Sequence, residues 1–154
     1  MNRLTIILLI SCLGCTKKNT LPDLEAEKES LMLLQNEQRQ AHMEKNVELL
    51  LDEDYDDYLE VNRGFVRKPT RAESTKRFQS YFDAVDFIKW DDVAPPVFSF
   101  SDDGTMATSV VDKIVITKLK EEGNRLDTAH FAWLVVYKKE NDKWHMHRMG
   151  STNR

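Results

Sequence analysis

Apolar positions in the first half of the chain recur at the spacing of amphipathic helices. Residues 23–45 contain no Gly or Pro and repeat apolar side chains along one helix face. Residues 47–53 predict a short second helix, which Asn46 can cap. The run Thr70-Arg71-Ala72-Glu73 fits a capping box, because the Thr and Glu side chains can each bond the other's backbone N–H. It predicts a third helix that ends near Asp83.

The second half of the chain changes to patterns typical of strands. Residues 85–93 and 97–101 are short β-rich runs, and Asp102-Asp103-Gly104 is a hairpin signal. Before the third helix, residues 58–61 predict a short strand and residues 62–69 a loop. Three longer strands are predicted at 106–119, 126–138 and 144–151. Helices followed by an antiparallel meander predict an α+β fold.

The segment Phe131–Tyr137 is apolar at every position instead of every second one. A strand that is apolar on both sides needs both of its faces covered. We expect the helices to cover one face, and a second subunit is a candidate cover for the other. Homodimerisation is therefore a hypothesis of the sequence, and a chain that sediments only as a monomer at high concentration would count against it.

The composition fits a single globular domain and excludes several classes of protein. The 154 residues are 41% hydrophobic and 31% charged, with a formal net charge of −4. This mild acidity argues against a nucleic-acid partner, which would require a clustered basic face. Both cysteines, Cys12 and Cys15, lie at the N-terminus. Disulfides, zinc–thiolate sites and cysteine nucleophiles are thus excluded from the folded part.

The N-terminal residues resemble the signal peptide and lipobox of bacterial lipoproteins. Arg3 precedes an apolar run from Leu4 to Leu13, which at about ten residues is half the length needed to span a bilayer. The resemblance implies a lipidated cysteine, either Cys15, which we favour, or Cys12. Residues 1–14 would then be a signal peptide. Residues 15–22 would be the lipidated N-terminus and tether, 23–151 the domain, and 152–154 a tail. The mature charge would be 21 − 26 = −5 without Arg3.

Several motifs occur in the order found in one superfamily. They are Asn46–Leu50, Asp56-Asp57-Tyr58, Ser101–Ala107, Ala132–Lys139 and Asn141–Trp144. In this order they resemble the nuclear-transport-factor-two-like superfamily, especially its SnoaL-like branch, over about residues 27–150. The resemblance implies a cone, in which a curved antiparallel sheet wraps around three N-terminal helices and a deep apolar pocket. Members include isomerases, cyclases, dehydratases and hydrolases as well as binding and assembly domains, so the fold does not fix the function.

The residues of one well-known chemistry of this superfamily are absent. Members similar to ketosteroid isomerase use a tyrosine on the first helix, a carboxylate base and a late neutral acid. An ungapped match through Asp56-Asp57 puts Gln38, Asn62 and approximately Trp133 at these positions. Gln38 and Asn62 can donate hydrogen bonds but cannot remove a proton from carbon. The resemblance therefore argues against that reaction.

Other polar side chains remain as candidates for the pocket. His145, His147 and Met149 alternate on the last predicted strand, so we expect all three to share one face. The resemblance implies that this face lines the pocket. They cannot meet on one ion, because strand residues i and i+4 lie about 13 Å apart. A metal would need a further ligand such as His130 or Asp112, so hydrogen-bonded histidines are the favoured interpretation. We predict no metal and no cofactor.

The candidate residues divide into two groups. Weak candidates for acid–base catalysis are His145, His147 and His130. Candidates for ligand binding are Gln38, His42, Asn62, Tyr81, Phe131, Trp133, His145 and His147.

The sequence thus favours a lipid-anchored protein of the bacterial cell envelope, whose domain faces the periplasm or the exterior. Its pocket would bind a small apolar molecule or a partner protein, without catalysis. The alternative is a cofactor-free SnoaL-like enzyme that uses pocket histidines, and a third possibility is an assembly subunit that dimerises through the sheet. A catalytic pocket should pair a histidine with a carboxylate, whereas a binding pocket should be apolar. An assembly role predicts an exposed apolar sheet face.

Overall fold

The structure of the chain is a computed structural model that describes residues 22–51 and 57–154. Within these residues there are three α-helices: α1 (Leu24–Glu44), α2 (Val47–Leu50) and α3 (Arg71–Ala84). The strands are β1 (Leu59–Asn62), β2 (Phe65–Arg67), β3 (Val85–Asp92), β4 (Val97–Phe100), β5 (Met106–Leu119), β6 (Arg125–Glu140) and β7 (Lys143–Asn153). A turn of 3₁₀ helix, η2 (Lys120–Glu122), precedes β6. The predicted lipidation cysteines and Asp56 lie outside the described residues. The second predicted helix is shorter than expected, because Leu51 is already extended.

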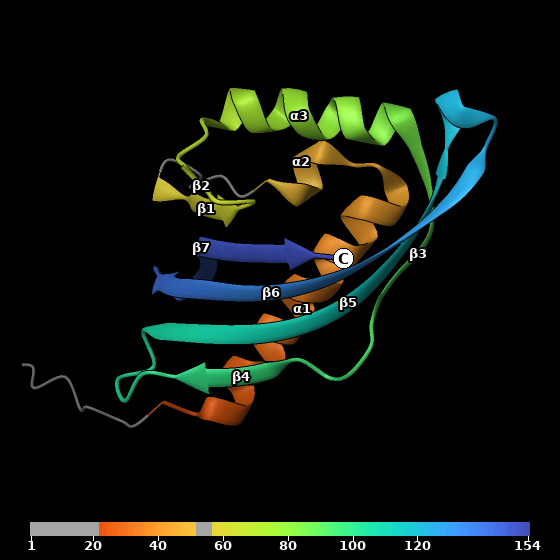
Figure 1. The fold of residues 1–154 in the computed structure, drawn as a ribbon. Coiled ribbons are helices and arrows are strands. Elements are labelled where there is room, and N and C mark those ends of the chain that lie inside the picture. The colour runs from red at the N-terminus through yellow and green to blue at the C-terminus, as the bar shows by residue number, and fades with distance from the viewer. Residues whose placement is uncertain (1–21, 52–56) are drawn as a thin grey trace, which may run out of the picture.

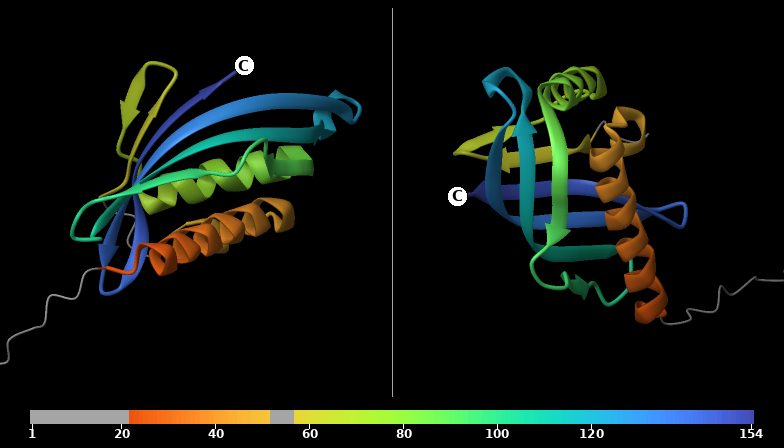
Figure 2. Two further views of the ribbon diagram at one scale, coloured as in Figure 1. Left: turned by 90° about the horizontal axis from the view of Figure 1, so that it is seen from below. Right: turned by 90° about the vertical axis from the view of Figure 1, so that its right-hand side faces the viewer.

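All the strands belong to one sheet, in the order β2-β1-β7-β6-β5-β3, with β4 also paired to β5. The strands β4 and β3 share one edge of β5, since β4 pairs with its first half and β3 with its second half. Figure 1 shows that the sheet is strongly curved, and Figure 2 shows α1 and α3 together on its concave side. The predicted α+β cone is confirmed.

The sheet departs from the prediction in two respects. It is mixed instead of wholly antiparallel, because β1 runs parallel to β7. The loop predicted at 62–69 is wrong, because it contains β2, which pairs with β1 around the turn Arg63-Gly64. Both turn residues have positive φ, at 50° and 79°. Such two-residue turns match the twist of a hairpin, but arginine is an unusual residue for this conformation.

The helices begin where the sequence predicts, and their caps show why. The Asp23 carboxylate accepts a hydrogen bond from the Ala26 N–H at the start of α1. The capping box at Thr70 and Glu73 is present at the start of α3 and confirms the prediction. Each cap satisfies backbone donors that the first helical turn leaves without partners.

Glu27 attaches the start of α1 to the last two strands. Its carboxylate accepts hydrogen bonds from the Lys139 ammonium at 2.6 Å and the Trp144 indole at 2.8 Å. One helical residue thereby fixes the position of α1 relative to both β6 and β7. The apolar stripe of α1, including Leu31 and Ala41, is buried as a result.

Two groups of buried side chains form the core. One is Val47, Leu51, Tyr58, Phe82, Val85, Phe87, Trp90 and Val115, and the other is Leu31, Ala107, Val135, Tyr137 and Trp144. The side chains of Trp133, Met146 and Met149 pack against both groups. These three residues therefore occupy the middle of the cone, where a ligand pocket is expected.

We predict that Gly104→Ala destabilises the protein more than Gly64→Ala. Both glycines have positive φ, which costs an alanine about 1–2 kcal/mol. A Cβ at Gly104 would also lie 2.6 Å from the Cβ of Pro22, whereas a Cβ at Gly64 would meet nothing within 4 Å. Urea unfolding should show a loss of about 1 kcal/mol for Gly64→Ala and at least about 2 kcal/mol for Gly104→Ala. Equal losses would mean that Pro22 does not pack on this turn.

Candidate functional site

The inner face of the sheet carries polar residues among its apolar ones. On β5 the inward positions alternate with outward ones and are buried: Ala107, Ser109, Val111, Lys113, Val115 and Thr117. The cross-strand partners of Val111 and Lys113 are Trp133 and Phe131 on β6. These pairs place aromatic rings and one buried ammonium group inside the cone.

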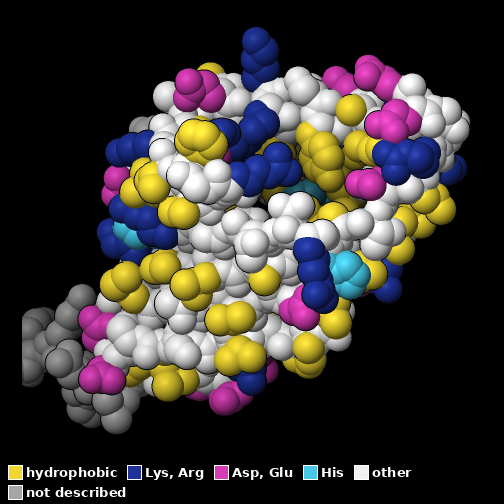
Figure 3. All heavy atoms as spheres, in the orientation of Figure 1, with side chains coloured by type: hydrophobic (Ala, Val, Ile, Leu, Met, Phe, Trp, Pro, Cys, Tyr) yellow, Lys and Arg dark blue, Asp and Glu magenta, His cyan; other side chains and the backbone are white. Residues whose placement is uncertain are grey.

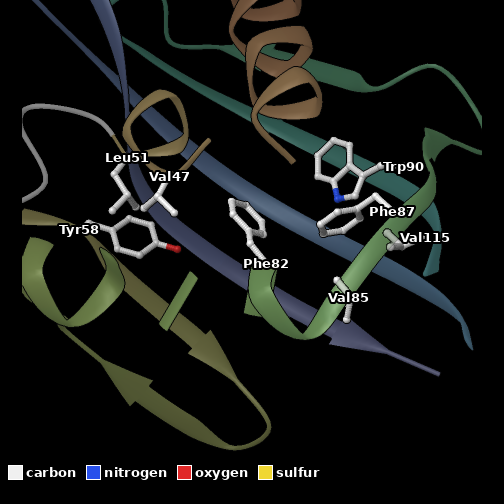
Figure 4. Packing of buried hydrophobic residues seen from close by; sticks show 8 residues of the cluster. All are labelled: Val47, Leu51, Tyr58, Phe82, Val85, Phe87, Trp90 and Val115. Atoms are coloured by element: carbon white, nitrogen blue, oxygen red, sulfur yellow. The ribbon is translucent and has the colours of Figure 1, made fainter. Parts of the chain in front are cut away.

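The His42 imidazole lies at the base of the cone, within a group of aromatic rings. It stacks on Trp90 of β3 with ring centroids 4.5 Å apart and planes inclined by 22°. Phe82 and Phe87 contact it edge-on at 5.7 Å and 5.6 Å, and Phe78 at 6.3 Å. Figure 4 shows Phe82, Phe87 and Trp90 close together where the end of α3 meets β3.

This environment keeps the His42 side chain neutral. Burial lowers its pKa to about 4, the hydrogen bond to Gln38 opposes this shift, and the charge of Lys113 adds to it. The imidazole Nδ1 lies 2.7 Å from the Gln38 backbone oxygen. Because a carbonyl can only accept, Nδ1 carries the proton and Nε2 is left with its lone pair. Among the described residues no carboxylate bonds this histidine.

Lys113 is the buried cation of the cone. Its residue is only 4% exposed. Its Nζ lies 2.5 Å from the Asp92 carboxylate and 3.8 Å from the centre of the Trp90 ring. Burial lowers the pKa of the ammonium, and the hydrogen bond and negative charge of Asp92 oppose that shift. A buried charge requires such a partner, so the ion pair and the ring together hold Lys113 against Trp90.

A second polar group lies deeper in the cone and is internally satisfied. The Gln35 amide donates to the Ser109 hydroxyl at 3.2 Å and to the Tyr137 hydroxyl at 3.3 Å. The two hydroxyl groups also lie 3.3 Å from each other. Their mutual hydrogen bonds suit a structural role.

The cone is open to solvent on one side. Figure 3 shows a hollow below α3 with hydrophobic side chains in it and charged side chains around it. Four side chains that point into the cone are only partly buried: His42, Phe131, Trp133 and Met149. Solvent therefore reaches the aromatic interior, as a binding pocket requires.

Most of the predicted ligand-binding residues lie at this interior. The His42 imidazole bonds the backbone carbonyl of Gln38, and the Gln38 residue is partly buried. The Tyr81 ring contacts Phe87 edge-on at 5.5 Å, and Phe131 contacts Trp133 at 5.7 Å. Asn62 lies at the exposed rim, opposite Ser151, which in turn lies opposite Trp133.

The other three predicted histidines lie elsewhere. The expectation that His145, His147 and Met149 share one face is wrong, because the pairing of β6 with β7 shifts by one residue between Val136 and Tyr137. Met149 points inward opposite Val135, His145 lies opposite outward-facing Lys138, and His147 is the extra residue of the bulge. His130 also faces outward, opposite Ile114.

Two principal residues of the interior, Trp90 and Lys113, were not predicted. The signal for Lys113 was its place in the alternation Val111-Asp112-Lys113-Ile114-Val115, where it occupies an inward position of a half-buried strand. A lysine there requires a buried partner, but the sequence does not show that Asp92 lies across from it.

Comparison with known proteins identifies the fold. No family model matches the sequence, and no curated protein matches it. Solved structures do match, among them a nuclear transport factor 2 (NTF2-like) superfamily protein from Salmonella enterica serovar Typhimurium, at 12% identity and a TM-score of 0.70. The match covers 84% of this chain and 92% of that one. The chain has the NTF2-like fold.

Other NTF2-like neighbours include enzymes. The hexachlorocyclohexane dehydrochlorinase LinA-type3 from Novosphingobium barchaimii has 12% identity and a TM-score of 0.68, over 86% of this chain and 89% of that one. A ketosteroid isomerase-like protein from Erwinia carotovora has 16% identity and a TM-score of 0.63, over 82% and 95%. At these identities the likeness concerns the fold alone.

We predict that His42 makes this NTF2-like domain less stable in acid. In the unfolded chain its pKa is about 6.5, and in the folded chain about 4. As the pH falls from 7 to 4.5, the unfolded state takes up the proton first, so linkage removes about 2.5 kcal/mol of stability. The loss of unfolding free energy between pH 7 and pH 4.5 should therefore be about 2.5 kcal/mol smaller in His42→Gln than in the parent. Equal pH dependence in the two proteins would show that His42 titrates normally in the fold.

Proposed function

We propose that this NTF2-like domain binds a small, largely apolar molecule inside its cone and does not catalyse a reaction on it. The supporting observation is the state of His42, the histidine at the base of the interior. It is neutral, surrounded by aromatic rings and bonded to a backbone carbonyl. A general base would be expected to be oriented by a carboxylate and to have a pKa near the working pH.

The polar groups around His42 support binding in the same way. Lys113 is bound to Asp92, and Gln35, Ser109 and Tyr137 bond one another. An apolar cavity with a few fixed polar groups is typical of ligand-binding sites. The enzymatic alternative relied on His130, His145 and His147, and the geometry offers no support for it, because His130 and His145 face away from the cone.

We predict that a large side chain at Ala129 blocks ligand binding. Ala129 lies on the inner face of β6, opposite buried Val115, whereas Ala132 lies on the outer face, opposite exposed Asp112. A naphthalene-type probe titrated against tryptophan fluorescence should bind Ala129→Phe at least about tenfold more weakly than the parent, since the ring occupies the pocket. Ala132→Phe, the matched control, should bind like the parent. Loss of binding in both variants, or in neither, would refute an interior site.

Anchoring at a membrane is the second part of the proposal. The support is the apolar run and cysteine of the N-terminus, and no helix among the described residues is long and apolar enough to cross a membrane. Mass spectrometry of the protein from a bacterial host should find acyl groups on Cys15, or on Cys12 if cleavage occurs earlier. The double variant Cys12→Ser, Cys15→Ser should lack them and leave the membrane fraction. Full membrane retention of that variant would contradict the anchor.

A row of exposed apolar residues on the outer face of the sheet favours self-association as a second function. One residue from each of six strands contributes to this outer row: Val97, Val110, Leu134, Gly150, Val61 and Val66, paired in that order. Its valine and leucine residues are between 49% and 70% exposed. A continuous apolar row of this kind is typical of an interaction surface.

We predict that Leu134→Lys weakens the homodimer and Leu126→Lys does not. Both leucines are exposed on the outer face of β6, but only Leu134 belongs to the outer row. A lysine within a buried apolar interface loses hydration without gaining a partner. Sedimentation velocity of the detergent-extracted chain should show dissociation of the Leu134 variant alone. A parent chain that is monomeric at high concentration would rule this function out.

A further inference from the structure

The indole nitrogen of Trp133 has no hydrogen-bond partner. Of the buried side-chain nitrogen and oxygen atoms in residues 22–51 and 57–154, it is the one found without a partner. An indole N–H is a donor only and is normally paired when it is buried. A buried donor without a partner costs free energy, so a ligand that supplies a hydrogen-bond acceptor is stabilised here.

Trp133 lies where such an acceptor would come from. It occupies the inner face of β6 between Val111 on β5 and Ser151 on β7, and packs against both parts of the core. Its ring centre lies 5.5 Å from that of Trp90 and 5.7 Å from that of Phe131. The residue is only partly buried although its nitrogen is covered. Part of the residue is therefore exposed, whereas its N–H is covered by protein atoms.

The surroundings of the Trp133 ring indicate the charge of the ligand group that would accept its hydrogen bond. The Lys113 ammonium, 5.8 Å from the Trp133 ring centre, is already neutralised by Asp92. The Nδ1–H of the nearby His42 ring donates a hydrogen bond to the Gln38 backbone carbonyl. An anionic or cationic ligand would meet no unpaired countercharge here and would lose its hydration. A neutral acceptor such as a carbonyl oxygen meets neither penalty.

We propose that the ligand of the cone is a neutral, planar, apolar molecule with a carbonyl-type oxygen that accepts a hydrogen bond from Trp133 Nε1. Its rings lie against Trp90 and Phe131, and Trp133 tilts so that its N–H edge meets the oxygen. This inference rests on the proposed ligand-binding function. Trp133 is then the residue that selects for the oxygen atom, and the aromatic rings supply the apolar contacts, which do not depend on that oxygen.

The test compares two probes that differ in the acceptor alone. These are 2-acetylnaphthalene and 2-ethylnaphthalene, titrated against the full chain in detergent. The parent should prefer the ketone, and Trp133→Phe, which keeps a ring but removes the N–H, should lose about five- to tenfold of that preference. Partition of the probes into detergent cancels, because the preference is compared between proteins in the same detergent.

Trp90→Phe is the matched control. It also removes an indole N–H from the interior, so it should weaken both probes alike and leave the preference for the ketone unchanged. If Trp133→Phe keeps the full preference while both probes bind, the role of Trp133 is overturned and the binding function stands. If neither probe binds the parent, both are overturned.

A measurement on the parent protein makes the test independent of how the variants fold. The infrared carbonyl band of bound 2-acetylnaphthalene should lie at lower frequency than in a hydrocarbon solvent, because the oxygen accepts a hydrogen bond. A band at the hydrocarbon position would overturn the proposal. A lowered band that persists in Trp133→Phe would assign the bond to another donor and would also overturn it.

Discussion

The stack of the His42 imidazole on the Trp90 indole is the interaction on which the interior of the cone depends. It joins the C-terminal part of α1 to β3, and the rings of α3 close around it. The Gln38 carbonyl sets the orientation of the imidazole, and the Lys113 ammonium packs on the same indole. Burial of the imidazole among rings makes its charged form unfavourable. The same contacts that close the base of the cone therefore hold the pKa of His42 well below its usual value.

Binding and catalysis make different demands on one fold, and our proposal of binding rests on how the polar groups of this interior are paired. NTF2-like neighbours with enzyme names, such as the dehydrochlorinase, show that the cone can accommodate catalysis. In this chain Lys113 is paired with Asp92, and the Ser109 and Tyr137 hydroxyl groups bond each other. The Trp133 N–H is a buried donor without a partner, and His42 Nε2 keeps its lone pair. A donor and a set of rings can orient a molecule.

Local signals in the sequence were sufficient for most of the fold. The caps of α1 and α3 and the hairpin at Asp102–Gly104 depend on neighbouring residues, and each lies where the sequence predicted it. The parallel pairing of β1 with β7 is a contact between distant segments, which local patterns do not encode. The short strand β2 was missed because its turn uses Arg63 at positive φ, where glycine or asparagine is the usual signal.

The candidate site was only partly predictable for the same reason. His42 was predicted from the helical spacing of the apolar stripe, and Phe131 and Trp133 as aromatic residues of an apolar strand. Trp90 joins them, with its ring centre 4.5 Å from that of His42 and 5.5 Å from that of Trp133. The bulge at His147 reverses the faces of all later residues on β7, and nothing in the local sequence marks it. Lys113 and Asp92 become a pair only when β3 lies beside β5. Pairing across strands thus decides which polar residues enter the cone.

The central claim is that the cone holds a molecule and is more than a packed core. Native mass spectrometry of the full chain, purified from the cells that produce it, tests it most directly. The account predicts an added mass on the parent protein that is lost on gentle activation and does not occur on Ala129→Phe. A parent protein with its covalent mass alone, or the same added mass on both proteins, would contradict it.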